Sequence, residues 1–514
     1  MTASVPPLAS ARDALARPHR WRVFGAAWLL FSLLAASWSF ATPIAASPDE
    51  PAHIVKAASV ARGQLIGEQS PLGQVVQVPR YIASTHAETC FAFKPDVSAD
   101  CAVPLSGSSS ELVDSTTTAG LYNPVYYVLV GLPSLLIGDA TGIYLMRAVS
   151  GILTSLFLAL TVVIAYGWRR NVLPLCAIAV ATPPMLYFLG GSVNPNAVEV
   201  TATLAVFVAM LAIILQPNDR LLGERAAIVL SGAVIAVNAR GLSPLWVAIA
   251  IFVPLMLTNW TTIRGLIRRP PVIVAIVGTV LATTFALVWL LRTNSLAAAF
   301  DDNSGYQAYP GVGSSPITGF INMFRETFGY AQGMIGNFGW LDTPAPAAAY
   351  FVWAVFAGVL LLAGFSVLRG RRLLFAAVLV GLYLLVPPVI QAAYITGGGM
   401  IWQGRYNLPL FAMFAFGVAV VLAERLPGLD EAILARFSLL IWLGWLLAQY
   451  LSFATALKRY AVGSNGSWKD VLLAPEWSAP LGNLVWLAGF GLLTAVSAWL
   501  AWRAGREHSL GPAS

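Results

Sequence analysis

Long apolar runs separated by short polar segments make up most of the chain. Many of them approach the roughly 20 residues that an α-helix needs to cross a bilayer. They predict an all-α polytopic membrane protein, a bundle of about 12 transmembrane helices within a range of about 11 to 13. The runs cover residues 23–43, 142–167, 171–189, 197–215, 226–239, 243–258, 271–291, 348–367, 372–394, 405–423, 436–455 and 484–502.

One more apolar segment, residues 122–138, contains two prolines, and we interpret it as juxtamembrane or re-entrant. Counting it as a span would place the basic segment 168–171 on the opposite side from the other basic segments. The runs 226–239 and 243–258 are short and are separated by Arg240. The sequence therefore does not fix their boundaries.

The short connections on one side of the predicted bundle are rich in arginine. With 12 spans, both chain ends and all these connections fall on one side, which the positive-inside rule assigns to the cytoplasm. Two large loops, 44–121 and 292–347, then lie on the extracytoplasmic side. The whole chain, residues 1–514, is expected to form a single membrane domain. Within the second loop, the glycine-rich segment 301–316 is expected to fold over a site without regular structure. The basic connections are 168–171, 218–225, 263–269, 369–372, 424–436 and 502–507.

The first apolar run has two interpretations. A basic flank, an apolar run and small residues after it also describe a secretory signal peptide. We expect a retained span, because the rest of the chain is membrane-bound and Asp49 and Glu50 would otherwise lie near a free end.

Composition agrees with this pattern. Hydrophobic residues make up 58% of the chain and charged residues only 10%, against about 25% charged in a typical soluble domain. The net charge of +7 does not indicate nucleic-acid binding, because most Lys and Arg residues lie beside apolar runs. Cys90 and Cys101 share the first outer loop, where an oxidising exterior leaves open either a disulfide or two free thiols.

Polar side chains that are costly near a membrane gather at four separate segments of the predicted outer face. Because these segments end at one membrane surface, we expect them to share a site. The residues are Asp49, Glu50 and His53; Asn194, Asn196 and Glu199; Trp340 and Asp342; and Gln403, Arg405 and Tyr406.

Each of these residues also has an ordinary structural interpretation. Asp49 after Pro48 is a suitable helix N-cap, with Glu50 favourable in the first turn. Glu199 could hydrogen-bond a neighbouring helix, and Arg405 could extend to the membrane interface. These interpretations do not explain why the residues gather on the face opposite the arginine-rich connections.

The cluster contains the groups that sugar transfer from a lipid phosphate requires. A carboxylate can accept the proton of an attacking hydroxyl. An interfacial arginine can hold a phosphate whose lipid tail lies between helices, and aromatic residues can cover a sugar ring. The sequence shows no Gly-rich phosphate loop or Rossmann pattern, which argues against a cytosolic nucleotide-sugar donor.

Four short motifs resemble the bacterial membrane-protein family of domain of unknown function 2142. They are "SPDEPAH" after the first span, "LYNPVYY" after the first large loop, "GWLD" in the second and "QGRYNLP" near the late spans. That family resembles a branch of the GT-C superfamily, multi-span glycosyltransferases that use polyprenyl-phosphate sugars. The resemblance implies a GT-C-like bundle in the bacterial cytoplasmic (inner) membrane, with both termini cytoplasmic and an extracytoplasmic active site.

The resemblance also implies roles for individual residues. An acidic residue in the first outer loop is the expected catalytic base of that superfamily. Here it is Asp49, with Glu50 as the alternative or as a partner that supports Asp49. Arg405 is the implied ligand of the donor phosphate, with Tyr406 and Gln403 beside it. The remaining positions are expected to bind substrate: His53, Tyr122, Asn123, Asn194, Asn196, Glu199, Trp340 and Asp342.

One departure from the family pattern bears on cofactors. Many relatives carry an Asn-x-Asp pattern in the loop equivalent to 192–199, whereas this chain has Asn196 in place of the acid and Glu199 one turn later. No residue is therefore assigned to a metal, and a divalent cation stays an open alternative. The expected partners are a polyprenyl-phosphate-linked sugar, a glycan or glycolipid acceptor and membrane lipids, with no nucleic acid.

Three functions compete on these grounds. The first is an inverting glycosyltransferase of cell-envelope glycan synthesis. The second is a transporter or flippase of a lipid-linked sugar, for which paired repeats and interrupted helices would be typical. The third is a non-catalytic partner of envelope assembly that docks through its outer loops. The sequence identifies neither the sugar nor the acceptor.

Overall fold

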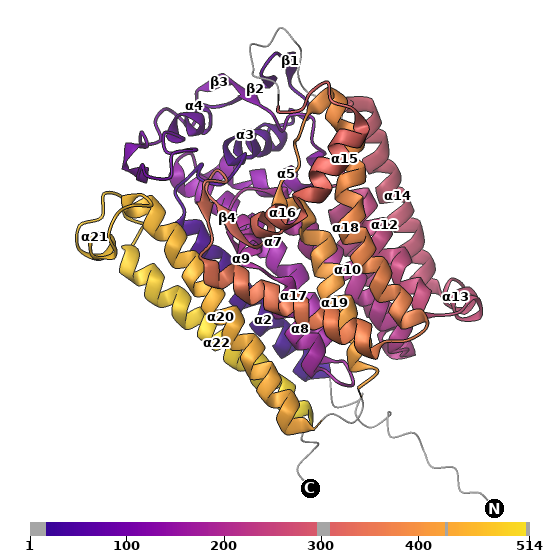
Figure 1. Cartoon of the computed structure of the whole chain (residues 1–514). Coiled ribbons are helices and arrows are strands. Elements are labelled where there is room, and N and C mark those ends of the chain that lie inside the picture. The colour runs from indigo at the N-terminus through magenta and orange to yellow at the C-terminus, as the bar shows by residue number, and fades with distance from the viewer. Residues whose placement is uncertain (1–16, 296–308, 427–429, 510–514) are drawn as a thin grey trace, which may run out of the picture.

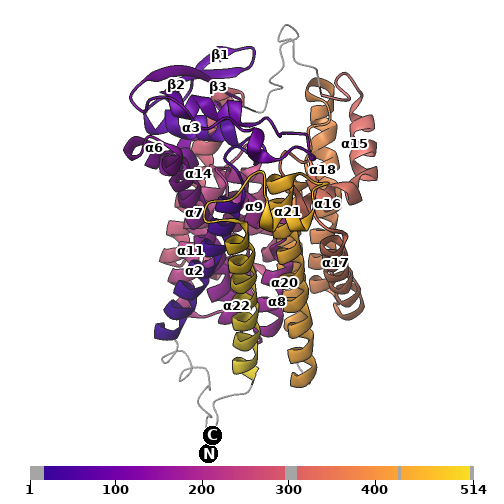
Figure 2. The same cartoon turned by 90° about the vertical axis from the view of Figure 1, so that its left-hand side faces the viewer.

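The computed structural model describes residues 17–295, 309–426 and 430–509. Long helices run side by side through the body of the molecule, and short strands and helices form a polar layer at one end (Figures 1 and 2). This is the all-α membrane architecture that the apolar runs predict.

Nine helices of the described ranges are long and apolar enough to cross a membrane, and up to ten spans result if one bent pair counts as a span. The bent pair is α8 (Val172–Ala181) and α9 (Pro184–Gly190), which meet at 67°. The nine are α2 (Arg17–Ala41), α7 (Ala140–Tyr166), α10 (Pro195–Leu215), α14 (Pro270–Thr293), α17 (Ala347–Val367), α18 (Arg371–Gly398), α19 (Leu408–Ala423), preceded by the 3₁₀ turn η4 (Gly404–Asn407), α20 (Glu431–Val462) and α22 (Asn483–Ser509).

The expected count of about 12 spans is not confirmed, because two of the predicted runs form weaker elements. The run 226–239 lies in α11 (Asp219–Val237), which begins with the charged sequence DRLLGER. The run 243–258 divides into α12 (Ser243–Phe252) and the 3₁₀ turn η3 (Val253–Leu257), where Pro254 lacks the N–H that a continued helix needs. Neither combines the length and the apolarity of the other spans. The short helix α13 (Trp260–Leu266) follows them.

The centre of the bundle is formed by α10 and α19. The membrane-length windows of these two helices are 83% and 94% buried, whereas that of α14 is 11% buried. Apolarity alone does not explain this position, because α14 has a mean hydropathy of 2.4 against 2.5 for α10 and 1.9 for α19, and lipid is as apolar as a protein interior. Because both helices begin at the polar layer, their polar first turns are also held inside the protein.

The arginine-rich connections gather at the opposite end of the bundle. Arg20 of α2 pairs with Glu224 of α11 at 3.3 Å. Arg170, after α7, donates to the backbone carbonyl of Ala423 at 3.3 Å. Segments from distant parts of the sequence therefore meet at one end, and the assignment of that end to the cytoplasm stays a prediction.

The first outer loop folds into the largest part of the polar layer. Val76 and Val78 of its antiparallel sheet are buried, since alternate residues of a strand share a face, and this strand packs against α3. The elements are α3 (Glu50–Ala61), the strands β1 (Glu68–Ser70), β2 (Gly73–Pro79) and β3 (Leu112–Thr117) in that order, α4 (Arg80–Ala83), η1 (Ser84–Glu88) and η2 (Ala99–Cys101).

Residues 122–138 do not form a membrane-length helix. They divide into α5 (Pro124–Gly131) and α6 (Pro133–Leu136), which pack against α3 and α7. A proline inside a helical segment removes a backbone hydrogen bond and ends the helix, so Pro133 explains the division. The juxtamembrane interpretation fits this arrangement.

The second outer loop is more regular than expected. Residues 301–308 of the predicted irregular segment lie outside the described residues. Turns at 309–314 precede a helix whose N-cap, Ser315, accepts a hydrogen bond from the backbone N–H of Thr318. The elements are α15 (Pro316–Arg325), α16 (Thr327–Gly336) and the two-stranded pair β4 (Asn337–Phe338) and β5 (Thr343–Pro344); α21 (Trp468–Leu473) lies in the last outer connection.

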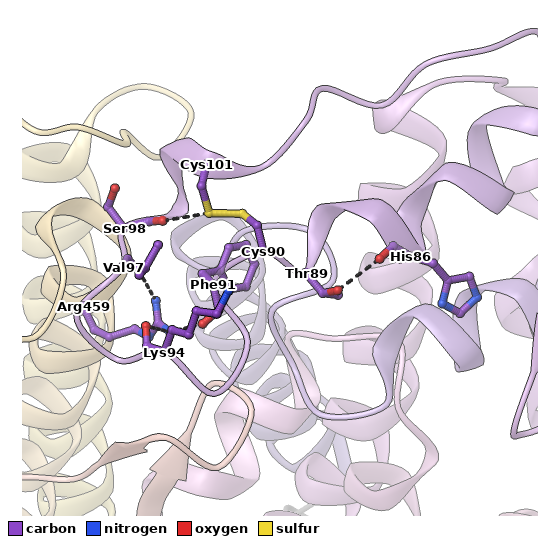
Figure 3. The surroundings of a disulfide bond; sticks show 9 residues. All are labelled: His86, Thr89, Cys90, Phe91, Lys94, Val97, Ser98, Cys101 and Arg459. Atoms are coloured by element: carbon purple, nitrogen blue, oxygen red, sulfur yellow. Dashed lines mark hydrogen bonds between the residues drawn. A yellow bond between two sulfur atoms is a disulfide. The ribbon is translucent and has the colours of Figure 1, made fainter. Parts of the chain in front are cut away.

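Cys90 and Cys101 form a disulfide, so the first of the two alternatives for these cysteines holds (Figure 3). Arg459 of α20 lies against the loop that the disulfide closes and donates to the backbone carbonyls of Phe91 at 2.8 Å and Val97 at 2.9 Å. The first outer loop is thereby fixed to a membrane helix.

Candidate functional site

Two residues of the polar layer form an ion pair across 356 positions of sequence. Arg405, in η4 ahead of α19, donates from Nη2 to Oδ2 of Asp49 at 2.5 Å. The Arg405 side chain is 1% exposed, but that of Asp49 is 46% exposed. The structure therefore brings the first outer acid and the late arginine together, with the carboxylate on the open side.

The local sequence PDEP explains how Asp49 is presented. Helix α3 begins at Glu50 with Pro51 in its first turn, where the missing N–H costs nothing. Asp49 occupies the N-cap position in the left-handed conformation, with φ 64°, and its side chain makes no capping hydrogen bond. This conformation is uncommon outside glycine and recurs at functional sites. The carboxylate is thus bound to Arg405 rather than to its own helix.

A second arginine, Arg240 between α11 and α12, completes the cluster. Its Nη1 donates to Oδ1 of Asn196 in α10, and its Cζ lies 4.4 Å from the ring centroid of Tyr406. The Tyr406 and Tyr122 side chains both lie near this guanidinium. Two cations and one open carboxylate therefore lie within one group of side chains.

A cavity of about 380 Å³ lies beside this cluster. Part of its wall is polar and is formed by Arg240, Tyr122 and Tyr406. Another part is apolar, so the cavity suits a molecule with an anionic group and an apolar chain. The apolar wall comes from α14 and α18 and includes Ala286, Trp289, Leu290, Ile390 and Ala393.

The polar residues at the start of α10 fix the surroundings of Asp49 and Arg240. Asn194 caps α10 by accepting from the amide of Asn196 at 3.0 Å, and its side chain donates to the carbonyl of Pro48 at 3.2 Å. Glu199, which also lines the cavity, accepts from Ser243 of α12 at 2.6 Å. Helix α10 is thereby tied to the residue before Asp49 and to the helix that follows Arg240.

The charges of the cluster set the protonation of its acid and its histidine. Burial favours the neutral form of Asp49, but the nearby Arg405 guanidinium outweighs this and holds the pKa of Asp49 below its ordinary value. His53, one turn further along α3, is buried and its Nδ1 is hydrogen-bonded to the Tyr127 hydroxyl at 2.8 Å. Burial, reinforced by the two arginines, lowers the pKa of His53 to about 3 despite Asp49. Asp49 is therefore ionised and His53 neutral near pH 7.

Glu50, the next residue, lies in a different environment. Its two carboxylate oxygens accept hydrogen bonds from Nε and Nη2 of Arg147 in α7, both at 2.7 Å. One of them also accepts from the backbone N–H of Val193 at 3.0 Å. Neither side chain of this pair has any exposed area. The structure closes this carboxylate off from the cavity.

Two residues of the GWLD motif lie in the polar layer but not at the cavity. Trp340 donates from Nε1 to the carbonyl of Ala45 at 3.0 Å, close to the segment that leads to Asp49. Asp342 pairs with Arg459 at 3.0 Å and is only 6% exposed. Its contacts thus join β5 and α20 beneath the disulfide loop.

The last two predicted residues lie on either side of the cluster. Asn123 lines the cavity, caps α5 and donates to Asn238 at 2.8 Å. Gln403 precedes η4, and its buried Oε1 has no hydrogen-bond partner among the described residues. The same holds for Nε and Nη1 of Arg405. The cluster therefore contains buried donors and an acceptor with unused hydrogen-bonding capacity.

Three arginines that organise this end of the protein were not assigned from the sequence. Arg147 lies inside the apolar run 142–167, and Arg240 separates two short runs. An ionisable residue in a membrane segment is a functional hypothesis by default, so both could have been singled out. Arg459 follows a predicted span and offers no comparable signal.

No group of three or more His, Cys, Asp or Glu residues within residues 17–295, 309–426 and 430–509 is placed to hold a metal ion. At the position where relatives were expected to carry an acid, Asn196 instead accepts a hydrogen bond from Arg240. The Arg240 and Arg405 guanidinium groups both lie near enough to Asp49 to act on its charge.

Comparison with known proteins gives a family match and a similarity to solved structures. The family model described as "Predicted membrane protein (DUF2142)" matches residues 31–414, most of the chain. Among solved structures, the chain is similar to the crystal structure of ArnT from Cupriavidus metallidurans bound to undecaprenyl phosphate. That match has 14% sequence identity and a TM-score of 0.44, and it covers 96% of this chain and 77% of that chain. No curated protein sequence matches the chain.

Proposed function

This chain belongs to the DUF2142 family of predicted membrane proteins, and we propose that it is an inverting, GT-C-type membrane glycosyltransferase. It moves a sugar from a polyprenyl-phosphate donor to an acceptor hydroxyl at the outer face of the cytoplasmic membrane. One observation carries the proposal. The half-exposed carboxylate of Asp49 pairs with Arg405, and Arg405 lies against Tyr406, which together with Arg240 lines a cavity that also has an apolar wall.

The apolar wall of the cavity suits the lipid chain of the donor. It is formed by α14 and α18, and α14 is the least buried of the nine candidate spans, with 11% of its membrane-length window covered. The cavity therefore lies behind a helix that faces the bilayer. A polyprenyl chain can occupy this wall while its phosphate lies at the polar end.

We assign the donor phosphate to Arg240 and Tyr406, because both line the cavity. An arginine fork and a phenol match the geometry of phosphate oxygens. Arg405, expected from the sequence to bind the phosphate, lies behind Tyr406 with its guanidinium Cζ 5.5 Å from that ring. It holds Asp49 and adds a second positive charge for the developing phosphate anion.

The reaction step follows from these positions. Asp49 accepts the proton of the acceptor hydroxyl as its oxygen forms a bond to the anomeric carbon of the sugar. The bond from that carbon to the phosphate oxygen breaks, and its electron pair leaves with the polyprenyl phosphate. Attack from the face opposite the phosphate inverts the anomeric carbon. Arg240 and Arg405 stabilise the negative charge that appears on the leaving group.

The neighbouring residues support this step without taking part in it. Glu50 fixes Arg147, which also donates to the carbonyls of Ser39, Thr42 and Pro43 at 2.7–2.8 Å and so holds the end of α2. We therefore propose a structural role for Glu50 and reserve the catalytic role for Asp49. Neutral His53 packs between Tyr122 and Tyr127 and shapes the wall behind the acid.

Two features support an extracytoplasmic site. The disulfide of the first outer loop requires an oxidising compartment to persist. The arginine-rich connections lie at the opposite end, where the positive-inside rule places the cytoplasm. Asp49 and the disulfide belong to the same polar layer, so the acceptor would be met outside the cytoplasm.

Transfer by the purified full-length protein is the direct test. The protein in lipid nanodiscs is incubated with a panel of polyprenyl-phosphate sugars carrying a radiolabel in the sugar, together with envelope glycans and glycolipids. Transfer of label is expected for the wild type and not for Asp49→Asn. Asp114→Asn, which removes an exposed acid of β3 whose side chain contacts Gln77, should transfer normally. Unchanged activity of Asp49→Asn, or no transfer from any donor, would contradict the proposal.

A lipid-linked sugar flippase is the second candidate, and one observation favours it. The pair α8 and α9 breaks by 67° within a buried segment, and interrupted helices are typical of transporters. Proteoliposomes loaded with a labelled polyprenyl-phosphate sugar separate the two functions. Movement of the lipid between leaflets without a new glycosidic bond would replace the transferase with the flippase.

A further inference from the structure

Arg405 is buried but only partly bonded. Its Nη2 donates to Asp49 at 2.5 Å, whereas Nε and Nη1 have no hydrogen-bond partner among the described residues. The Oε1 of Gln403, two residues earlier, is unbonded within the same ranges. Buried polar groups without partners are costly, and each such group in a native protein needs a reason. A ligand that completes the bonding of Arg405 is one such reason.

In this ion pair, the Asp49 side chain is exposed and the Arg405 side chain is buried. The Asp49 side chain is 46% exposed and that of Arg405 is 1% exposed. The backbone of Asp49 is in the left-handed region, with φ 64°, and no capping bond holds the side chain to α3. A single ion pair is thus the main attachment of this carboxylate, and a competing anion can displace it.

The proposed phosphate position lies next to Arg405. Arg240 and Arg405 approach the same Tyr406 ring, with their Cζ atoms 4.4 Å and 5.5 Å from its centroid. A phosphate bound by Arg240 and Tyr406 at the cavity wall therefore shares a neighbour, the Tyr406 ring, with the unbonded donors of Arg405.

We propose that Arg405 is shared: it binds Asp49 while the site is empty and turns to the donor phosphate when the donor binds, which frees the carboxylate. This inference rests on the function proposed above. It makes Arg405 a positioning residue that couples donor binding to the release of the catalytic base.

The sharing has a chemical consequence. A carboxylate paired with a guanidinium is a weak base, because the positive charge stabilises its ionised form. Once the phosphate takes the guanidinium, Asp49 regains its affinity for a proton and can activate a hydroxyl. Asp49 therefore becomes an effective base only when the phosphate of the donor is bound.

The test measures the affinity of polyprenyl phosphate, without any sugar, for the full-length protein in detergent. The change in tryptophan fluorescence is a suitable signal, since Trp289 and Trp402 line the cavity. Asp49→Asn should bind this lipid about 10-fold more tightly than the wild type, because Arg405 no longer has a charged competitor. Asp114→Asn, which loses the same charge elsewhere in the polar layer, should bind as the wild type does.

A double-mutant cycle separates sharing from simple repulsion between two anions. If Arg405 is shared, the gain from Asp49→Asn disappears when Arg405→Gln is also present. An equal gain in both backgrounds means that the carboxylate only repels the phosphate, and the inference is wrong. If neither the wild type nor Asp49→Asn binds polyprenyl phosphate, the proposed function itself fails.

Infrared difference spectroscopy gives an independent answer if Arg405→Gln does not fold. The carboxylate band of Asp49 is identified by its absence in Asp49→Asn. Addition of polyprenyl phosphate to the wild type should shift this band, because the carboxylate loses its guanidinium partner. A band that stays unchanged on lipid binding would overturn the inference.

Discussion

Asp49 and Glu50 are adjacent in sequence, and each pairs with a buried arginine from a distant part of the chain. The Glu50–Arg147 pair is closed: all three nitrogens of Arg147 donate, and neither side chain is exposed. The Asp49–Arg405 pair is open, with a half-exposed carboxylate and two unbonded guanidinium nitrogens. A fully bonded pair can only hold structure, whereas an incompletely bonded one can accept a ligand.

The difference arises at the start of α3. Glu50 is the first residue of the helix, and its side chain turns into the bundle toward α7. Asp49 precedes the helix in a left-handed conformation, and its side chain reaches η4 beside the cavity. Two adjacent acids therefore have different proposed roles: Glu50 is structural and Asp49 takes part in the reaction. Four predictions can break or sharpen this comparison.

The largest effect is expected for Asp49→Asn. Loss of the general base should reduce sugar transfer by about 10³-fold or more. The free energy of unfolding should fall less than in Glu50→Gln, because the replaced side chain is 46% exposed and its amide oxygen can still accept a hydrogen bond from the buried Arg405. Activity and thermal unfolding of the same preparation are the measurements. A large loss of stability would mean that the open pair is structural after all.

Glu50→Gln should give the opposite result. It leaves Arg147 buried without its charged partner, which typically costs about 3–5 kcal/mol. Yield and thermal stability should fall, yet transfer per folded molecule should stay close to that of the wild type. A stable Glu50→Gln protein without activity would move the catalytic role from Asp49 to Glu50.

Arg240→Gln should weaken donor binding by roughly 100-fold, since a hydrogen bond to a charged group is worth about 1.5–3 kcal/mol. The effect should appear in KM for the polyprenyl-phosphate sugar and also in kcat, because Arg240 binds the phosphate and stabilises the charge that develops on it. Arg22→Gln, an exposed arginine at the opposite end, is the control and should leave KM unchanged. An unaltered KM in Arg240→Gln would remove this residue from the phosphate site.

The smallest effect concerns Glu88, a buried acid near the closed pair. Burial raises the pKa of Glu88 to about 7, although the nearby Arg147 opposes this. Because the folded protein holds this proton more tightly than the unfolded chain, stability should fall as pH rises from about 5 to 8, by about 2 kcal/mol at most. In Glu88→Gln this decline should be reduced. Parallel slopes for both proteins would show that another group is responsible.

The sequence by itself determined the class of this protein and the segments that matter. Apolar runs of membrane length define helices wherever they occur, because an unbonded backbone is too costly in lipid. Motifs at the ends of such runs pointed to Asp49 and Arg405, since polar residues at a membrane surface need a reason. The exact number of spans is not confirmed at α11 and α12, where charge and proline weaken the apolar signal.

Tertiary structure alone decided which of these residues can act. Nothing in "PDEP" distinguishes Asp49 from Glu50, because the difference depends on Arg147 and Arg405, which lie 97 and 356 positions from their partners. Arg240 joined the site only when α10, α11 and α19 packed around it. Contacts between distant segments are set by the packing of whole helices, so no local pattern could reveal which acid would be closed and which left open.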